Sequence, residues 1–104
     1  MIKQINPITA IESVKSGSLF IDVREVEEVT EMNYDISNYI NIPLGLLEFR
    51  LSEIPTDKEL ILACRSGGRS QSACNILFKN GYTNLSNLEG GIIGWQRSGN
   101  PVKK

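Results

Sequence analysis

Histidine is absent from the 104 residues of the chain, and this absence excludes several chemistries at once. A Ser-His-Asp or Cys-His arrangement needs an imidazole to take the proton from the nucleophile. The commonest zinc ligand is missing too, and the two cysteines cannot close a structural zinc site by themselves. We therefore expect no metal and no cofactor, so any nucleophile must be activated by its surroundings.

The chain also lacks a strong net charge and a long apolar run. Eleven basic and twelve acidic residues give a formal net charge of −1, which leaves no basic field to hold a nucleic-acid backbone. Residues 1–10 contain no apolar stretch of the kind that a signal peptide needs, and the sequence has no membrane span. With so few cysteines, reduced thiols are expected rather than a disulfide framework. These absences predict a cytoplasmic protein with no nucleic-acid or membrane partner.

The length of the chain fits one domain and is too short for two. A composition of 40% hydrophobic and 22% charged residues is enough to build one core and excludes wholesale disorder. We expect a single domain over residues 1–104, with residues 1–4 and 103–104 as loose ends. The oligomeric state cannot be read from the sequence.

Short apolar runs alternate with segments of helical spacing. The apolar runs predict strands at residues 19–23, 40–43, 59–64 and 83–88. Helical spacing predicts helices at residues 7–16, 46–54, 70–80 and 92–98, the first of them with Asn6 as its N-cap and Pro7 at its first position. We interpret the acidic stretch 24–39 as a loop with a helical turn, and residues 101–104 as a tail.

This alternation predicts an α/β fold, a small mostly parallel β-sheet with helices on both faces, because parallel neighbours need crossover connections. Ligands of such sheets bind at the carboxyl ends of the strands. Cys64 lies at the end of the clearest apolar run and is followed by a short loop and a helix. It is therefore the first candidate for a reactive group.

The loop after Cys64 is suited to an anion. Its backbone N–H groups and the amino end of the following helix would point toward the sulfur, and Arg65 and Arg69 would add positive charge. Such surroundings lower the pKa of a thiol, so most of it would be a nucleophilic thiolate at neutral pH. No histidine is needed for this activation.

The other loop residues have matching roles. Gly67 and Gly68 would let the chain turn tightly and bring its N–H groups close to a bound sulfur, and Ser66 and Ser70 would offer hydroxyls to the same centre. A cysteine at a strand end can also be a small buried hydrophobe, and a glycine pair can be a plain turn. The whole string between a strand and a helix favours the functional interpretation.

This loop, Cys64-Arg65-Ser66-Gly67-Gly68-Arg69-Ser70, resembles the active-site loop of the rhodanese family. Further segments, spread over nearly the whole chain, also resemble motifs of this family. They are Asp22-Val23-Arg24-Glu25, Asn41-Ile42-Pro43-Leu44, Leu88-Glu89-Gly90-Gly91-Ile92 with Trp95, and Gly99-Asn100-Pro101-Val102. In place of the family's usual Gly-His-Ile segment, the chain has residues 34–39, which puts local structure and rim shape in question.

The resemblance implies a rhodanese fold and a sulfurtransferase. Cys64 would take sulfane sulfur from a donor such as thiosulfate, a persulfide or a polysulfide. It would carry this sulfur as a persulfide and pass it to cyanide, a thiol or an acceptor protein. The sequence names neither the physiological donor nor the acceptor.

Two other functions stay open at this stage. One is a Cys-dependent phosphatase or arsenate reductase, but four residues separate Cys64 from Arg69, whereas those relatives have one more and so a wider loop. The other is a rhodanese-like binding module without catalysis, which the presence of Cys64 weakens.

The remaining candidates have plainer explanations. We expect Asp22 and Arg24 to hold the strand end as scaffold of the site rather than to touch substrate. Cys74 is expected to be buried in the helix after the loop rather than to act as a resolving thiol, and Trp95 to fill the core. Arg69 is expected to hold the loop, while Arg65 faces the entrance and attracts an anionic donor.

Overall fold

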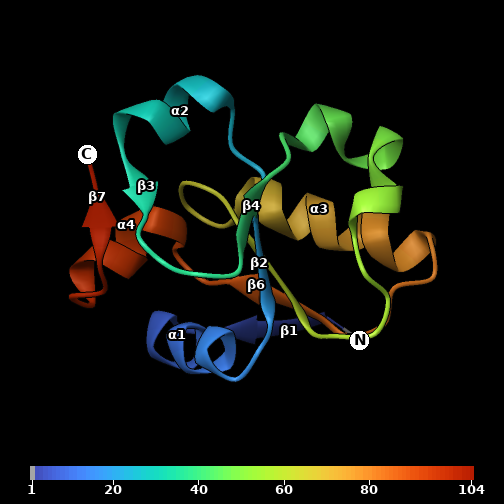
Figure 1. Ribbon diagram of the computed structural model, residues 1–104, viewed down its shortest axis with the longest axis horizontal. Coiled ribbons are helices and arrows are strands. Elements are labelled where there is room, and N and C mark those ends of the chain that lie inside the picture. The colour runs from blue at the N-terminus through green and yellow to red at the C-terminus, as the bar shows by residue number, and fades with distance from the viewer. Residues whose placement is uncertain (1) are drawn as a thin grey trace.

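A central parallel sheet organises the molecule, which we describe from a computed structural model for residues 2–104. Its strand order is β1-β6-β5-β2-β4, and all neighbouring pairs are parallel. The strand bounds are β1 Ile2–Ile5, β2 Leu19–Asp22, β4 Tyr39–Asn41, β5 Leu60–Ala63 and β6 Leu85–Leu88. A second, two-stranded sheet pairs β3 (Asn33–Tyr34) with β7 (Val102–Lys103) in antiparallel fashion (Figure 1).

Helices cover both faces of the central sheet, as predicted (Figure 1). The α-helices are α1 Pro7–Lys15, α2 Val26–Glu31, α3 Gly68–Lys79 and α4 Gly91–Arg97, and two 3₁₀ helices, η1 Leu44–Phe49 and η2 Leu51–Glu53, precede β5. Asn6 caps α1 by accepting the N–H of Thr9 at 2.8 Å, with Pro7 at the first helical position. No helix within residues 2–104 is long and apolar enough to cross a membrane.

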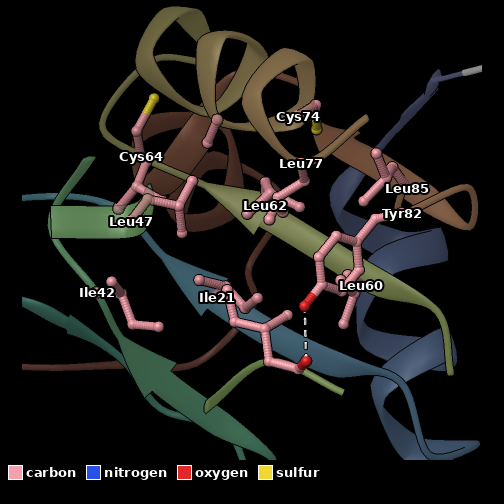
Figure 2. Packing of buried hydrophobic residues seen from close by; sticks show 13 residues of the cluster. Ile21, Ile42, Leu47, Leu60, Leu62, Cys64, Cys74, Leu77, Tyr82 and Leu85 are labelled. Atoms are coloured by element: carbon pink, nitrogen blue, oxygen red, sulfur yellow. Dashed lines mark hydrogen bonds between the residues drawn. The ribbon is translucent and has the colours of Figure 1, made fainter. Parts of the chain in front are cut away.

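The central strand β5 divides the apolar side chains into two cores, because alternate residues of a strand point to opposite faces. Leu60 and Leu62 belong to the core under α3 and η1, which also holds Leu77 (Figure 2). Ile61 and Ala63 belong to the core shared by α1 and α4. Both faces of β5 are buried, which explains its uninterrupted apolar sequence.

The chain ends differ from the expectation that they are loose. Residues 2–5 form the edge strand β1, with Ile5 buried and Lys3 and Gln4 exposed. Val102 and Lys103 form β7. Both strands are short and polar on one side, which is typical of protected edges and leaves little periodicity to detect. Met1 lies outside the described residues.

Two internal predictions were also wrong in detail. The acidic stretch, expected as a loop with a helical turn, contains the short helix α2, which fits the expected turn, and the strand β3, which was not expected. The Glu28 carboxylate accepts the N–H of Glu25 at 2.9 Å and thereby satisfies a free donor at the helix start. Residues 46–54 form 3₁₀ turns instead of one α-helix, with Leu47 and Ile54 buried and Phe49 84% exposed.

Candidate functional site

Cys64 lies directly after β5, at the carboxyl edge of the parallel sheet where the sequence placed it. Its side chain is buried, and Sγ accepts the backbone N–H of Gly67 at 3.0 Å. Ser70, in the first turn of α3, places its Oγ 3.4 Å from the same sulfur. The strand, the loop and the helix thus converge on a single sulfur atom.

The surroundings of Cys64 change its acidity in opposing ways. Burial raises the pKa of the thiol, but hydrogen bonds from the Ser70 hydroxyl and from the backbone N–H groups of Ser70, Gly67 and Ser66 outweigh this effect. The net result is a pKa below the ordinary value of a cysteine. Ser66 acts here through its backbone, because its side chain is exposed, whereas Ser70 contributes its hydroxyl.

Gly67 and Gly68 of the loop differ in backbone conformation and in the space that a Cβ would find. Gly67 has φ of +113°, a conformation that disfavours a Cβ, and it directly precedes α3. Gly68 is the first residue of α3, and a Cβ there would meet open space. The turn therefore depends on Gly67, whereas no protein atom of the described residues excludes a Cβ at Gly68, and the expected role of Gly68 beside a bound sulfur stays a prediction.

The underside of the loop is held by groups that sequence reasoning missed. The carbonyl oxygen of Cys64 accepts the hydroxyl of Tyr34 at 2.7 Å and the N–H of Ile92 at 3.0 Å. Gly91, with φ of +54°, leaves no room for a Cβ against the carbonyls of Cys64 and Arg65. The Gly90-Gly91 pair was a visible signal, but nothing in the sequence shows that Tyr34 reaches the loop.

Arg69 and Arg65 have different environments. The guanidinium of Arg69 makes a two-pronged ion pair with the carboxylate of Glu28 on α2, at 2.7 and 2.8 Å. This pair ties the first turn of α3 to α2, and it holds the pKa of Glu28 at about 2. Arg65 is exposed at the rim and lines a pocket of about 200 Å³ beside Glu31, Met32 and Ile92.

Asp22 and Arg24 form a buried ion pair at the end of β2, with a closest N–O distance of 2.8 Å. The hydroxyl of Tyr39 donates to Asp22 at 2.7 Å, and Arg24 donates to the carbonyl of Met32 at 2.9 Å. These contacts join the strand end to β4 and to the segment after α2. The expected ion pair at the strand end is therefore present, and its role as scaffold of the site stays a prediction.

Cys74 and Trp95 are buried in the two separate cores. Cys74 is a free thiol between α3 and the sheet, where burial raises its pKa to about 12 (Figure 2). It is therefore protonated and weakly nucleophilic at neutral pH. Trp95 packs against Phe20 and Tyr34 with ring centroids 5.6 and 5.2 Å apart, and its Nε1–H donates to the carbonyl of Pro101 at 2.8 Å.

The sheet and the site at its carboxyl edge define a class of α/β domain in which a free cysteine heads an amide-lined loop between a strand and a helix. A family model described as the rhodanese-like domain matches residues 8–98. The chain therefore belongs to the family of rhodanese-like domains, as the resemblance of its motifs implied.

Individual relatives agree with this assignment. A sulfurtransferase of Allochromatium vinosum is 40% identical over 84 residues, which cover 81% of this chain and 77% of that protein. A thiosulfate sulfurtransferase of Saccharomyces cerevisiae is 34% identical, with 86% and 67% coverage. A rhodanese-related protein of Thermoplasma volcanium has a crystal structure that superimposes with a TM-score of 0.85 at 34% identity, covering 97% of each chain.

Proposed function

We propose that the chain is a sulfurtransferase in which Cys64 carries sulfane sulfur as a persulfide. The observation that carries this proposal is the buried Cys64 sulfur, which accepts the Gly67 N–H at 3.0 Å and has a lowered pKa. N–H donors that stabilise a thiolate also stabilise the anionic outer sulfur of a persulfide, because both present a negative sulfur to the same loop. Membership of the family and the sulfurtransferase relatives support the same chemistry.

The reaction has two steps, each a displacement at sulfur that needs no external oxidant or reductant. The Cys64 thiolate attacks the outer sulfur of thiosulfate, the S–S bond of the donor breaks, and sulfite leaves with the electron pair. A thiophilic acceptor such as cyanide or a thiolate then attacks the outer sulfur of the persulfide. The Cys64–sulfur bond breaks and the thiolate of Cys64 returns, so no metal, redox cofactor or general base is required. An acceptor protein with a thiol would use the same second step.

Two features disfavour phosphoryl or arsenate chemistry. Arg69, the arginine of the loop that would hold a tetrahedral oxyanion, is bound in a two-pronged ion pair to Glu28. Asp22, an acid near the strand ends, is buried and paired with Arg24. Arg69 is therefore not free to bind an oxyanion at Cys64, and Asp22 is not free to protonate a leaving group there.

The proposal is tested by incubating the protein with thiosulfate and measuring its intact mass, followed by thiocyanate release with cyanide. We expect a one-sulfur mass increase on Cys64 and cyanide-dependent turnover, and we expect the Cys64→Ser variant to fold and to lose both. The absence of an adduct with thiosulfate, glutathione persulfide and polysulfide alike would contradict the proposal. An adduct that persists in Cys64→Ser would contradict the assignment of the carrier.

The exposed charge of Arg65 is proposed to attract an anionic donor. We expect Arg65→Ala to raise KM for thiosulfate several-fold, with a smaller change for a neutral donor. Arg97→Ala is the matched control, because Arg97 is also exposed but lies in the last turn of α4. Equal effects of Arg65→Ala on charged and neutral donors would argue against an electrostatic role at the entrance.

A further inference from the structure

A network of polar side chains lies next to Ser70 and is centred on the buried side chain of Asn87. Asn87 of β6 points its Oδ1 toward Ser70 Oγ, 2.5 Å away. Its Nδ2 group donates to Gln4 Oε1 at 2.9 Å and to the Gly67 carbonyl at 3.3 Å, and it also reaches Gln71 Oε1 at 3.3 Å. Because the Gly67 carbonyl can only accept, the amide nitrogen must lie on that side. The orientation of the Asn87 amide is thereby fixed.

The Ser70 hydroxyl has one proton and several groups that compete for it. Asn87 Oδ1 lies at 2.5 Å, the Gly67 carbonyl at 3.2 Å and Cys64 Sγ at 3.4 Å. Asn87 Oδ1 has no proton of its own, so its short contact exists only when Ser70 donates to it. In that arrangement Ser70 can accept the S–H proton of Cys64 but cannot donate to the sulfur.

We propose that Asn87 is a positioning residue, which competes with the sulfur of Cys64 for the hydroxyl proton of Ser70. While Cys64 is a thiol, Ser70 donates to Asn87 and accepts from Cys64. When the thiol proton leaves to solvent, the Ser70 O–H turns toward the anionic sulfur, and Asn87 Oδ1 loses its donor. No bond of Ser70 is broken, because only its hydroxyl rotates.

This competition adjusts the reactivity of Cys64. The loss of the Ser70–Asn87 hydrogen bond opposes ionisation of the sulfur and so limits the effect of the N–H donors in the loop. A thiolate of higher pKa is the stronger nucleophile, so an unlimited decrease in pKa would weaken attack on the donor. The N–H donors of the loop thus keep the thiolate present, and Asn87 limits the loss of nucleophilicity that a still lower pKa would cause. The proposal rests on the proposed function for its choice of Cys64 as the reacting thiol.

Other charged and titratable groups near Cys64 stay in place when Asn87 is changed. Tyr34 from β3 donates to the Cys64 carbonyl, and Arg69 from α3 is held by Glu28 of α2. Arg65 is exposed at the rim. Strand β6, which carries Asn87, has no ionisable side chain, so a neutral substitution at Asn87 leaves the charges around the sulfur unaltered.

The test is the pH dependence of iodoacetamide alkylation of Cys64, measured by mass in a Cys74→Ser background. Asn87→Leu keeps the branched shape and the number of side-chain heavy atoms and removes the acceptor, so we expect the alkylation midpoint to move down by about one pH unit, the effect of one hydrogen bond to a charged group. Gln4→Ala is the control, because it removes a partner of the same amide without touching Ser70. We expect it to leave the midpoint unchanged.

Two further variants separate a specific effect from a structural one. In a Ser70→Ala background, Asn87→Leu should no longer move the midpoint, whereas a general deformation of the loop would move it in both backgrounds. Asn87→Asp keeps the size of the side chain and offers a stronger acceptor, but it also adds a negative charge, which acts with or without Ser70. The midpoint should therefore move up further than it does for Asn87→Asp in the Ser70→Ala background. This variant keeps the test valid if Asn87→Leu does not fold.

An Asn87→Leu shift that persists without the Ser70 hydroxyl, or the absence of any Ser70-dependent shift in both Asn87 variants, would overturn the proposal. Alkylation measures the ionisation of the Cys64 thiol directly and needs no sulfur donor. A failure of sulfur transfer and a failure of the Asn87 proposal are therefore distinguishable results.

Discussion

The two thiols of the chain share one core cluster but have opposite acidities. The sulfur of Cys64 receives N–H donors from the loop, while Cys74 is surrounded by apolar side chains under α3 and its pKa is raised to about 12. These opposite shifts separate two residues of one type into a more reactive and a less reactive thiol. Position in the fold, rather than residue type, decides which of the two thiols ionises more readily.

We expect iodoacetamide at neutral pH to label Cys64 and to leave Cys74 unmodified until the protein is unfolded. The pKa of Cys64 is lowered, so its reactivity persists below the pH at which an ordinary thiol becomes protonated. Reactivity is lost only as the pH falls through that lowered pKa. Peptide mass mapping of the labelled sites measures both effects.

The Cys64→Ser variant is the control for this experiment and should remain unlabelled while folded. Labelling of Cys74 in the folded variant would show that the helix α3 opens more readily than its burial indicates. The Cys74→Ser variant should retain most of the sulfur transfer, because Cys74 lies outside the loop.

Residue roles were predictable from sequence only where a local motif carries them. The loop between Cys64 and Ser70 is contiguous, so its N–H donors follow from the order strand, glycine turn, helix. Tyr34 and Asn87 act from distant strands, at a carbonyl and a hydroxyl respectively. No spacing in the chain indicates such partners, because they depend on how the strands are placed beside one another.

At the scale of elements, the loop and helix α3 meet at two glycines that differ in backbone conformation and in the space available for a Cβ. Gly67 has positive φ and Gly68 has helical surroundings with open space beside it. We expect Gly67→Ala to destabilise the protein by roughly 1 kcal/mol and to slow sulfur loading. Gly68→Ala should stabilise it by roughly 0.5–1 kcal/mol, because alanine favours a helix. Urea unfolding of the two variants checks the contrast, and equal destabilisation would contradict it.

Helices α2 and α3 are joined by the ion pair between Glu28 and Arg69. The pKa of Glu28 falls from an ordinary 4.5 to about 2, so the stabilisation is present above the ordinary value and is lost as the pH falls toward 2. We expect Glu28→Gln to lower stability by about 1 kcal/mol at neutral pH, since the pair is partly exposed. The difference from the wild type should disappear near pH 2.

Thermal unfolding over this pH range measures the effect, and Glu53→Gln is the matched control. Glu53 pairs with Arg50 on an exposed 3₁₀ segment, which joins no two helices. A Glu28→Gln variant whose deficit is independent of pH would show that Glu28 acts through packing and not through its charge.

The elements that sequence predicted well are those with buried faces. The strand β5 and helices α1 and α3 have apolar residues at the period of their structure, and Asn6 and Gly67 mark two of the helix starts. Helix α2 was expected only as a helical turn without bounds, because its stabilising groups are a carboxylate cap and an ion pair to a distant arginine, and none of its residues is buried. A hydrophobic pattern cannot reveal an element of that kind.

At the scale of the whole molecule, the alternation of strands and helices was sufficient to predict the parallel sheet and the position of the site at its carboxyl edge. The edge strand β1 was not predictable, because it has a single buried residue, Ile5, beside the polar Lys3 and Gln4. Its pairing with β6 nevertheless covers the strand that carries Asn87. The first residues of the chain are thus part of the support for the site.

We expect Ile5→Ala to reduce the free energy of unfolding by about 3 kcal/mol, the usual effect of truncating a buried isoleucine. Ile8→Ala is the control, since Ile8 lies close in sequence but is 63% exposed, and its effect should stay within about 0.5 kcal/mol. Urea denaturation measures both. Equal small effects would mean that residues 2–5 contribute little to the sheet.

The interior is divided into two cores, and each core contains a residue whose signal shows whether that face of the sheet is still covered. Trp95 is the single tryptophan and lies in the core under α1 and α4, whereas Cys74 lies in the core under α3. Fluorescence emission therefore follows one face and thiol accessibility follows the other, without any label built into the protein. Coincident transitions would show that both halves unfold as one cooperative unit, while separate midpoints would reveal a half-open molecule in which only one face of the sheet is still covered.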